Sequence, residues 1–253
     1  MNHTFAWASA LFLVNVFTGW GYICRSLKDI PQDMKKYHPQ NIAGVPLLIE
    51  TIYKTVWRTA EKTGRADKLR KGIKLSNFLR KFGIDVRRKL FKQVIDGLGG
   101  ELEYIVIGGA YLDPVYEKGL SDLGIEVFNG YGTTECSPGI TISTYENYKF
   151  GSCGKPMGCE IKIKNPDEDG IGEICVKGDN VMVGYFEDPE ATASVMDGDW
   201  FMTGDYGYID EDGFLFYVGR KKNLIVLSNG KNVSPEELED QLTRLDYVKE
   251  VIV

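Results

Sequence analysis

One stretch constrains the fold more than any other, because a strand, a helix and a second strand follow one another between residues 103 and 128. Glu103–Ile107 is rich in β-forming residues and leads into the glycine loop Gly108-Gly109-Ala110. Asp113–Leu123 has a helical pattern, and Ile125–Phe128 predicts a second strand that delivers the chain to Asn129. Since such crossovers are right-handed, the strands are expected to lie parallel with both loops at their carboxyl ends, where these sheets bind ligands. The sequence therefore predicts an α/β fold with a ligand crevice.

Helical patterns dominate before this unit, and β patterns dominate after it. Leu47–Arg70 predicts one long surface helix, and Gly83–Leu98 predicts another. Short strands separated by glycine and proline predict a small antiparallel sheet or open barrel; they are Glu160–Lys164, Gly172–Lys177 and Phe214–Val218. Ser234-Pro235-Glu236-Glu237 is typical of a helix start, and this helix is expected to run to Leu245. Three shorter elements are also predicted, a helix and turn over 27–39, a strand over 41–45 and a strand over 248–253.

Composition narrows the class of protein. A formal charge of −6 and a pI near 5.2 argue against a dedicated nucleic-acid binder, whose phosphate contacts need a basic surface. The five cysteines form no C-x-x-C pair, and the chain has only two histidines, so no zinc set is expected. These features predict a reduced, cytoplasmic protein that handles small molecules.

Two segments leave a membrane question open. Residues 54–92 hold fourteen Lys/Arg against three acids, which indicates either solvated helix faces or a patch that meets anionic lipid or an anionic substrate. Residues 5–23 carry no charge, yet polar residues and glycines interrupt them and no basic residue precedes them. We favour a buried helix and strand for 5–23 and keep a membrane segment as the alternative.

The run from Asn129 to Glu135 offers groups that a nucleotide needs. Gly130 and Gly132 allow close approach of a ligand to the backbone, and Tyr131 offers a flat face to a purine. Thr133 and Thr134 supply hydroxyl and amide donors, and Glu135 supplies an oxygen for Mg²⁺. By itself the run could also be a turn with a capping threonine. Further along, the carboxylate of Asp205 could accept both hydroxyls of a ribose diol.

Taken together, these segments resemble the adenylate-forming, or AMP-binding, superfamily of acyl-CoA synthetases, luciferases and peptide-synthetase adenylation domains. Tyr131-Gly-Thr-Thr-Glu135 is similar to the family's Tyr-Gly-x-Thr-Glu signature. The other resembling segments are Gly108-Gly109-Ala110, Gly151–Pro156, Gly172–Gly178, Trp200–Asp205 and Val218–Lys222. The resemblance implies binding of ATP or AMP through Gly108, Gly109, Ala110, Asn129, Gly130, Tyr131, Gly132, Thr133, Thr134, Asp205, Tyr217 and Arg220, with Mg²⁺ on Glu135.

The resemblance also assigns roles to the hinge and the acyl pocket. It implies catalytic roles for Thr134, Glu135, Arg220 and Lys222, with Lys222 at the hinge about which a small domain rotates. Gly230 matches the glycine brought to the pantetheine channel of CoA. Asn2-His3-Thr4-Phe5 is similar to the segment whose His and aromatic residue border the acyl pocket, so His3 and Phe5 are expected to contact substrate.

Gly44–Tyr53 resembles the bacterial long-chain fatty acyl-CoA synthetase branch. The implied function is ATP-dependent adenylation of a fatty acid, followed by acyl transfer to CoA. Two alternatives stay open, namely a catalytically dead nucleotide-binding remnant and an enzyme that activates aryl or amino acids. No nucleic-acid partner is expected.

The resemblance divides the chain into three parts. Residues 1–148 correspond to the second half of the α/β adenylation domain, 149–218 to a β-barrel-like subdomain, and 219–253 to the hinge and the start of an α+β carboxy-terminal domain. The family's phosphate-binding loop and its late catalytic lysine have no counterpart in the sequence. We therefore expect a fragment of a larger enzyme, weakly active or inactive alone.

Overall fold

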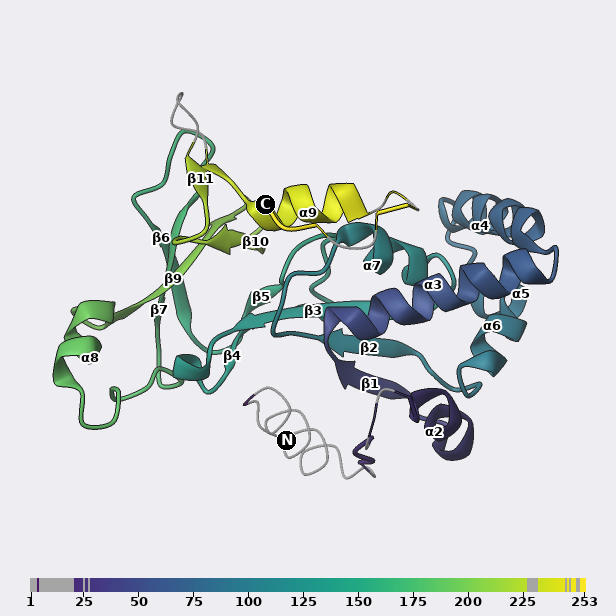
Figure 1. Ribbon diagram of the computed structural model, residues 1–253, viewed down its shortest axis with the longest axis horizontal. Coiled ribbons are helices and arrows are strands. Elements are labelled where there is room, and N and C mark those ends of the chain that lie inside the picture. Colours follow the sequence, from purple (N-terminus) through teal and green to yellow (C-terminus); the bar gives the residue numbers. More distant parts are fainter. Residues whose placement is uncertain are drawn as a thin grey trace. The chain divides into compact units, whose positions relative to one another are not determined.

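The structure is a computed structural model, and it describes residues 4, 21–24, 26, 28–226, 232–243, 245, 247–248 and 251–253. It divides into two compact units, Met1–Phe128 and Asn129–Val253 (Figure 1). Across the described ranges, no helix has both the length and the apolar character needed to span a bilayer. The predictions for His3, Phe5 and Gly230, and for most of the uncharged stretch 5–23, lie outside the described residues.

The first unit is built on the predicted strand, helix and strand. Strand β1 (Asn41–Gly44) pairs in parallel with β2 (Tyr104–Ile107), and β3 (Glu126–Gly132) is the next strand in the sheet. Helix α7 (Pro114–Ser121) connects β2 to β3, and the Asp113 side chain caps it by accepting from the Val115 N–H. The prediction of an α/β fold is confirmed, with fully buried Ile105, Ile107 and Val127 in the sheet's core.

The prediction of one long helix over 47–70 is wrong. The structure has two helices there, α3 (Pro46–Lys62) and α4 (Ala66–Arg80), separated by a turn in which Gly64 takes a φ of +65°. That left-handed conformation suits glycine and ends the helix. The short helix predicted within 27–39 is present as α2 (Ile30–Tyr37).

The prediction of a second long helix over 83–98 is also wrong. The structure has two short helices there, α5 (Arg87–Leu90) and α6 (Lys92–Gly97), which are separated at the buried Phe91. Gly83 has a φ of +76°, and Asp85 bonds the N–H and guanidinium of Arg87, so the segment before α5 is a turn. The four-residue spacing of apolar side chains is therefore met by two separate helical turns.

The second unit is mainly antiparallel. The end of β3 pairs with β4 (Gly139–Ile142), which pairs with β5 (Lys155–Pro156). A second sheet has the order β10-β9-β7-β6, with β8 beside β9, and confirms the expected small antiparallel sheet. Its strands are β6 (Glu160–Lys164), β7 (Gly172–Lys177), β8 (Met196–Asp197), β9 (Trp200–Ile209) and β10 (Leu215–Arg220). Fully buried Ile174, Val176 and Leu215 lie in its core.

The remaining elements are short. They are η1 (Thr134–Cys136), α8 (Pro189–Val195), the strand pair β11 (Ile225–Val226) and β12 (Asn232–Val233), and α9 (Pro235–Thr243). Helix α9 begins where the Ser-Pro-Glu-Glu pattern predicts. Within the range 248–253, where a strand is expected, the described residues 248 and 251–253 are in no strand. The three-part division at 148 and 218 stays a prediction.

Candidate functional site

The glycine-rich run that the sequence places in a loop begins as a strand. Asn129–Gly132 completes β3 and pairs with β4, with a shift of register between Tyr131 and Gly132. A Cβ at Gly132 would lie 1.7 Å from the Pro138 carbonyl oxygen. Only glycine can occupy this position without moving the backbone, so the residue sets how closely the two strands approach beside Tyr131.

Asp205 is the centre of the site in the second unit. It lies in β9, is 2% exposed, and its Oδ2 accepts a hydrogen bond of 2.7 Å from the Tyr131 hydroxyl. Arg220 in β10 is the register partner of Asp205, and its Nε lies 3.1 Å from Oδ1. Residues 131, 205 and 220, which the sequence predicted to act together, are thus brought together by β3, β9 and β10.

The groups around Asp205 shift the pKa of its carboxyl group in opposite directions. Burial raises the pKa of this carboxyl group, the Tyr131 hydrogen bond and the Arg220 charge lower it, and Glu135 and Glu173 raise it again. Burial, followed by the nearby Asp205 charge, holds the pKa of Tyr131 well above its ordinary value. Tyr131 therefore keeps its proton and donates a hydrogen bond to the carboxylate.

An aromatic pair lies beside the carboxylate. The ring centroids of Tyr131 and Tyr217 are 5.9 Å apart, with 34° between their planes. Tyr217 belongs to β10, and the pairing of β10 with β9 shifts register between Tyr217 and Gly219. The sequence-predicted Tyr217 therefore shares the site with Tyr131, Asp205 and Arg220.

Glu135 is held by a tyrosine that sequence reasoning did not single out. It lies in η1, is half-buried, and its Oε1 accepts a 2.9 Å hydrogen bond from the Tyr185 hydroxyl. The Met182 N–H also donates to the Glu135 carbonyl. Tyr185 follows Glu135 by 50 residues, and no spacing pattern in the sequence connects the two. The neighbouring Thr134 is exposed, whereas the Thr133 hydroxyl is buried without a hydrogen-bond partner among the described residues.

The two lysines in the turn after β10 differ in their surroundings. Lys221 donates to Glu173 at 2.7 Å, and its N–H donates to the Gly204 carbonyl at 2.9 Å, so this lysine fastens the turn to β7 and β9. Glu173 in turn raises the pKa of Lys221. Lys222 is exposed, and the hinge role that the resemblance implies for it stays a prediction.

The predicted adenine loop belongs to the first unit. Gly108 is buried directly after β2, and Gly109 and Ala110 are exposed. Gly109 has a φ of +87°, which a residue with a side chain rarely adopts. The loop follows the carboxyl end of β2, as expected, and its contact with a nucleotide stays a prediction.

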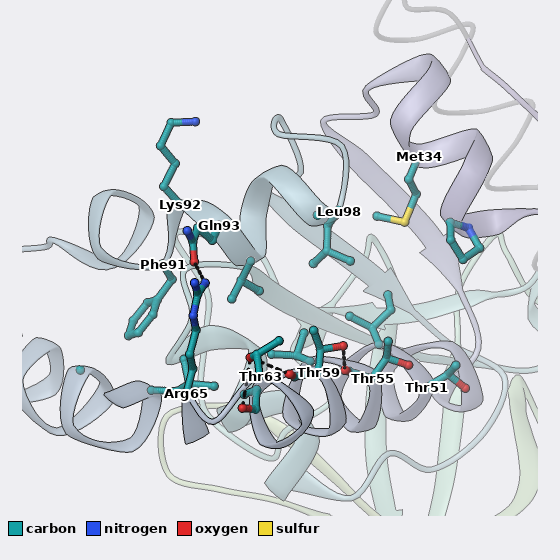
Figure 2. A pocket seen from close by; sticks show the side chains of 18 of the residues that line it. Met34, Thr51, Thr55, Thr59, Thr63, Arg65, Phe91, Lys92, Gln93 and Leu98 are labelled. Carbon is teal, nitrogen blue, oxygen red and sulfur yellow. Dashed lines mark hydrogen bonds between the residues drawn. The ribbon is translucent and has the colours of Figure 1, made fainter. Parts of the chain in front are cut away.

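A cavity of about 870 Å³ lies elsewhere in the first unit, among α2, α3, α4, α5 and α6 (Figure 2). None of the sequence-predicted site residues that the structure describes lines it. The hydroxyls of Thr51, Thr59 and Thr63 bond back to carbonyls of α3, and Arg65 donates to Gln93 at 2.7 Å. Because these polar groups are already paired and most of the other lining side chains are apolar, the cavity offers mainly apolar volume. We therefore place the candidate site around Asp205.

The side chains around Asp205 fit an adenosine nucleotide. The buried Oδ1 of Asp205 has no hydrogen bond of good geometry, although Arg220 lies close to it, and a ribose diol would supply the missing donors. The tyrosine pair offers an apolar flat surface, and the half-exposed Arg220 offers positive charge. No group of three or more potential ligands for a metal ion occurs among the described residues. Glu135 alone would therefore share Mg²⁺ with ligand phosphates, as that ion commonly requires.

Comparisons with known proteins identify the class. The family of AMP-binding enzymes matches residues 1–186. The long-chain-fatty-acid–CoA ligase FadD15 of Mycobacterium bovis is 32% identical over 90% of this chain and 39% of its own length. Long-chain-fatty-acid–CoA ligase 5 of Mus musculus is 33% identical over 92% of this chain and 36% of its own length.

Solved structures of CoA synthetases have a similar fold. The o-succinylbenzoate CoA synthetase of Bacillus subtilis, in complex with its acyl-adenylate intermediate, superposes with a TM-score of 0.69 at 26% identity, over 98% of this chain and 45% of that one. The same synthetase with ATP and a magnesium ion gives a TM-score of 0.63 at 27% identity, over 89% and 40%.

The fold is that of the adenylate-forming class of enzymes. The chain belongs to the AMP-binding enzyme family. It spans about two-fifths of the length of the curated relatives it matches.

Proposed function

We propose that the chain is the nucleotide-binding part of an acyl-CoA synthetase that uses ATP and Mg²⁺ to adenylate a fatty acid and then transfers the acyl group to CoA. The observation that carries the proposal is the convergence of Tyr131 and Arg220 on the buried carboxylate of Asp205, with the Tyr217 ring beside that of Tyr131. These residues come from segments that also resemble the family's nucleotide-binding segments. The match to long-chain ligases supports a fatty acid as the carboxylate.

In this proposal each group has a separate task. Asp205 accepts the two ribose hydroxyls with its two oxygens. Tyr131 and Tyr217 lie beside the nucleoside, and Arg220 attracts the negative charge of the α-phosphate. Glu135 binds Mg²⁺, and Thr134 donates to a phosphate oxygen. Together they offset the negative charge that develops when the carboxylate of the substrate attacks the α-phosphorus. Tyr185 positions Glu135 through its hydrogen bond.

The remaining assignments follow the resemblance. The proposal assigns the loop Gly108-Gly109-Ala110 to the adenine, Lys222 to the hinge, Gly230 to the pantetheine arm of CoA, and His3 and Phe5 to the acyl chain. We propose a cytoplasmic location for the catalytic unit.

A second substrate class has its own support. The Bacillus subtilis synthetase acts on o-succinylbenzoate, an aryl acid, and its structure covers nearly all of this chain. The nucleotide groups serve either acid equally, because they contact only the adenylate. Ligand binding must therefore distinguish a fatty acid from an aryl acid.

The proposal is tested with non-hydrolysable acyl-adenylate analogues, one carrying a long alkyl chain and one carrying an aryl acid. We expect the alkyl analogue to raise the Tm of the chain, since a ligand at a hundred times its Kd stabilises a protein by about 2.7 kcal/mol. Asp205→Asn should remove most of the shift. Asp199→Asn, which changes an exposed carboxylate paired with Lys177, is the matched control and should keep it. Equal shifts for Asp205→Asn and wild type would contradict the site, and a shift with the aryl analogue only would favour the aryl alternative.

A further inference from the structure

One face of α4 exposes large apolar side chains to solvent. Leu75 and Phe78 in the helix, and Phe82 in the turn that follows, are 54%, 57% and 67% exposed. The rings of Phe78 and Phe82 contact each other edge to face, with centroids 5.2 Å apart. Together with Lys71 and Lys74, these residues recur at helical spacing and therefore share one face, which we call the α4 face. A single exposed apolar residue is ordinary, whereas a cluster with touching aromatic rings indicates an interaction surface.

The charge around this face has one sign. From Lys68 to Ile84 the sequence has six Lys/Arg and no Asp or Glu, although the whole chain carries a net charge of −6. Lys71 and Lys74 belong to the face, and the exposed Arg80 and Lys81 follow it. The segment that exposes these apolar side chains therefore carries positive charge with no acidic residue to offset it.

The opposite side of α4 is anchored to the first unit. Gly72 lies so close to the buried Phe91 that a Cβ there would be 3.2 Å from its ring. Ser76 is fully buried, and Asn77 donates to the Asp122 carboxylate at 3.0 Å. Since the inner side is fixed by these contacts, the outer residues are displayed in one defined orientation.

We propose that the α4 face docks on an anionic lipid bilayer. Phe78, Phe82 and Leu75 insert at the level of the headgroups, and the surrounding lysines and arginines meet the negative headgroups, as in an interfacial amphipathic helix. An aromatic pair beside cationic residues on one helix face is the pattern of a helix that binds at a membrane surface. The inference goes beyond the proposed function, because none of its residues belongs to the Asp205 site.

The test is cosedimentation of the whole chain with vesicles of phosphatidylcholine, with or without about 30% phosphatidylserine. We expect binding to the anionic vesicles that weakens with salt, and binding to the neutral vesicles that is weaker by at least about tenfold. Phe78→Ser/Phe82→Ser and Lys71→Glu/Lys74→Glu should each lower the affinity, the charge reversal by about twentyfold or more.

Two control variants separate this face from general surface properties. Lys28→Glu/Lys35→Glu makes the same change of net charge at exposed positions in and before α2, and Phe186→Ser removes an aromatic ring that is 89% exposed in the second unit. Both should bind like wild type, and an unchanged Tm and circular dichroism spectrum show that each variant is folded. The proposal is overturned if wild type does not bind anionic vesicles, or if the α4 variants and the controls bind equally.

Discussion

At the scale of single residues, the Asp205 carboxylate is buried near Glu135 and Glu173, and burial raises its pKa above the ordinary value. The folded protein therefore holds this proton more tightly than the unfolded chain does. The resulting contribution to stability is fully present below the ordinary carboxylate pKa and is lost as the pH rises through the higher, folded value. At neutral pH the charge that is proposed to bind ribose consequently lowers the stability of the free protein.

Asp205→Asn should therefore raise the Tm at pH 7, because it removes the charge and keeps an acceptor for the Tyr131 hydroxyl. The expected gain is on the order of 1 kcal/mol, or about 2–4 °C, since the half-exposed Arg220 loses only a weak ion pair. Thermal denaturation between pH 4 and pH 7 is the measurement, and the gain should shrink as the pH falls. The control Asp199→Asn, whose pKa Lys177 lowers, should not raise the Tm. A loss of stability at pH 7 in Asp205→Asn would contradict this account.

At the scale of elements, the close contact between β3 and β4 depends on Gly132. Gly132→Ala should destabilise the protein by about 1–3 kcal/mol, because its Cβ would overlap the Pro138 carbonyl and force the strands apart. Gly97→Ala in α6 is the matched control, since nothing lies within 4 Å of that Cβ and alanine favours helix. Chemical denaturation compares the two variants, and equal stabilities would show that β4 can move away at little cost.

The elements that the sequence predicts well are those whose local pattern matches their burial. The strand, helix and strand over 103–128 and strands β6 and β7 are of this kind. Strand β9 was not predicted, although its residues alternate between buried and partly exposed. The reason is that its buried side carries Thr203, Asp205 and Gly207, so the alternation is invisible as hydrophobicity. The breaks at Gly64 and Phe91 depend on a backbone conformation and a tertiary contact, which helical periodicity does not encode.

At the scale of the whole molecule, all five cysteines are free thiols. Cys24 is exposed, whereas Cys136 and Cys175 are buried. Burial raises the pKa of Cys136 to about 11 and also raises that of Cys175. Their reactive thiolate forms are therefore scarce near neutral pH.

Alkylation followed by mass spectrometry should modify Cys24 first in the native protein, and Cys136 and Cys175 only after unfolding. All five thiols should react in denaturant, and a reducing agent should leave the Tm unchanged. A Tm that falls on reduction, or fewer than five reactive thiols in denaturant, would reveal a disulfide and contradict the structure.

The candidate site could be predicted from the sequence only in part. Segments around Tyr131, Asp205 and Arg220 were expected to act together because they resemble one family. In the second unit, the side chains of Tyr131 and Arg220 both lie within bonding distance of the Asp205 carboxylate. Tyr185 could not be found in this way, since its hydrogen bond joins a loop to Glu135 in η1 and no spacing pattern in the sequence connects the two residues. Glu173, which holds Lys221, lies within a recognised segment but has no signal of its own.

The register shift in β10 explains how the side chains of Tyr217 and Arg220 can both lie on the side of the sheet that carries Asp205. In an unbroken strand, side chains three positions apart project to opposite sides, so one of the two would turn away. The extra residue at Val218 changes the parity of everything after it, and both side chains then project to the side of Asp205. The odd spacing between this tyrosine and this arginine is therefore geometrically meaningful, and aligning the segment with a gap at residue 218 would misplace the guanidinium.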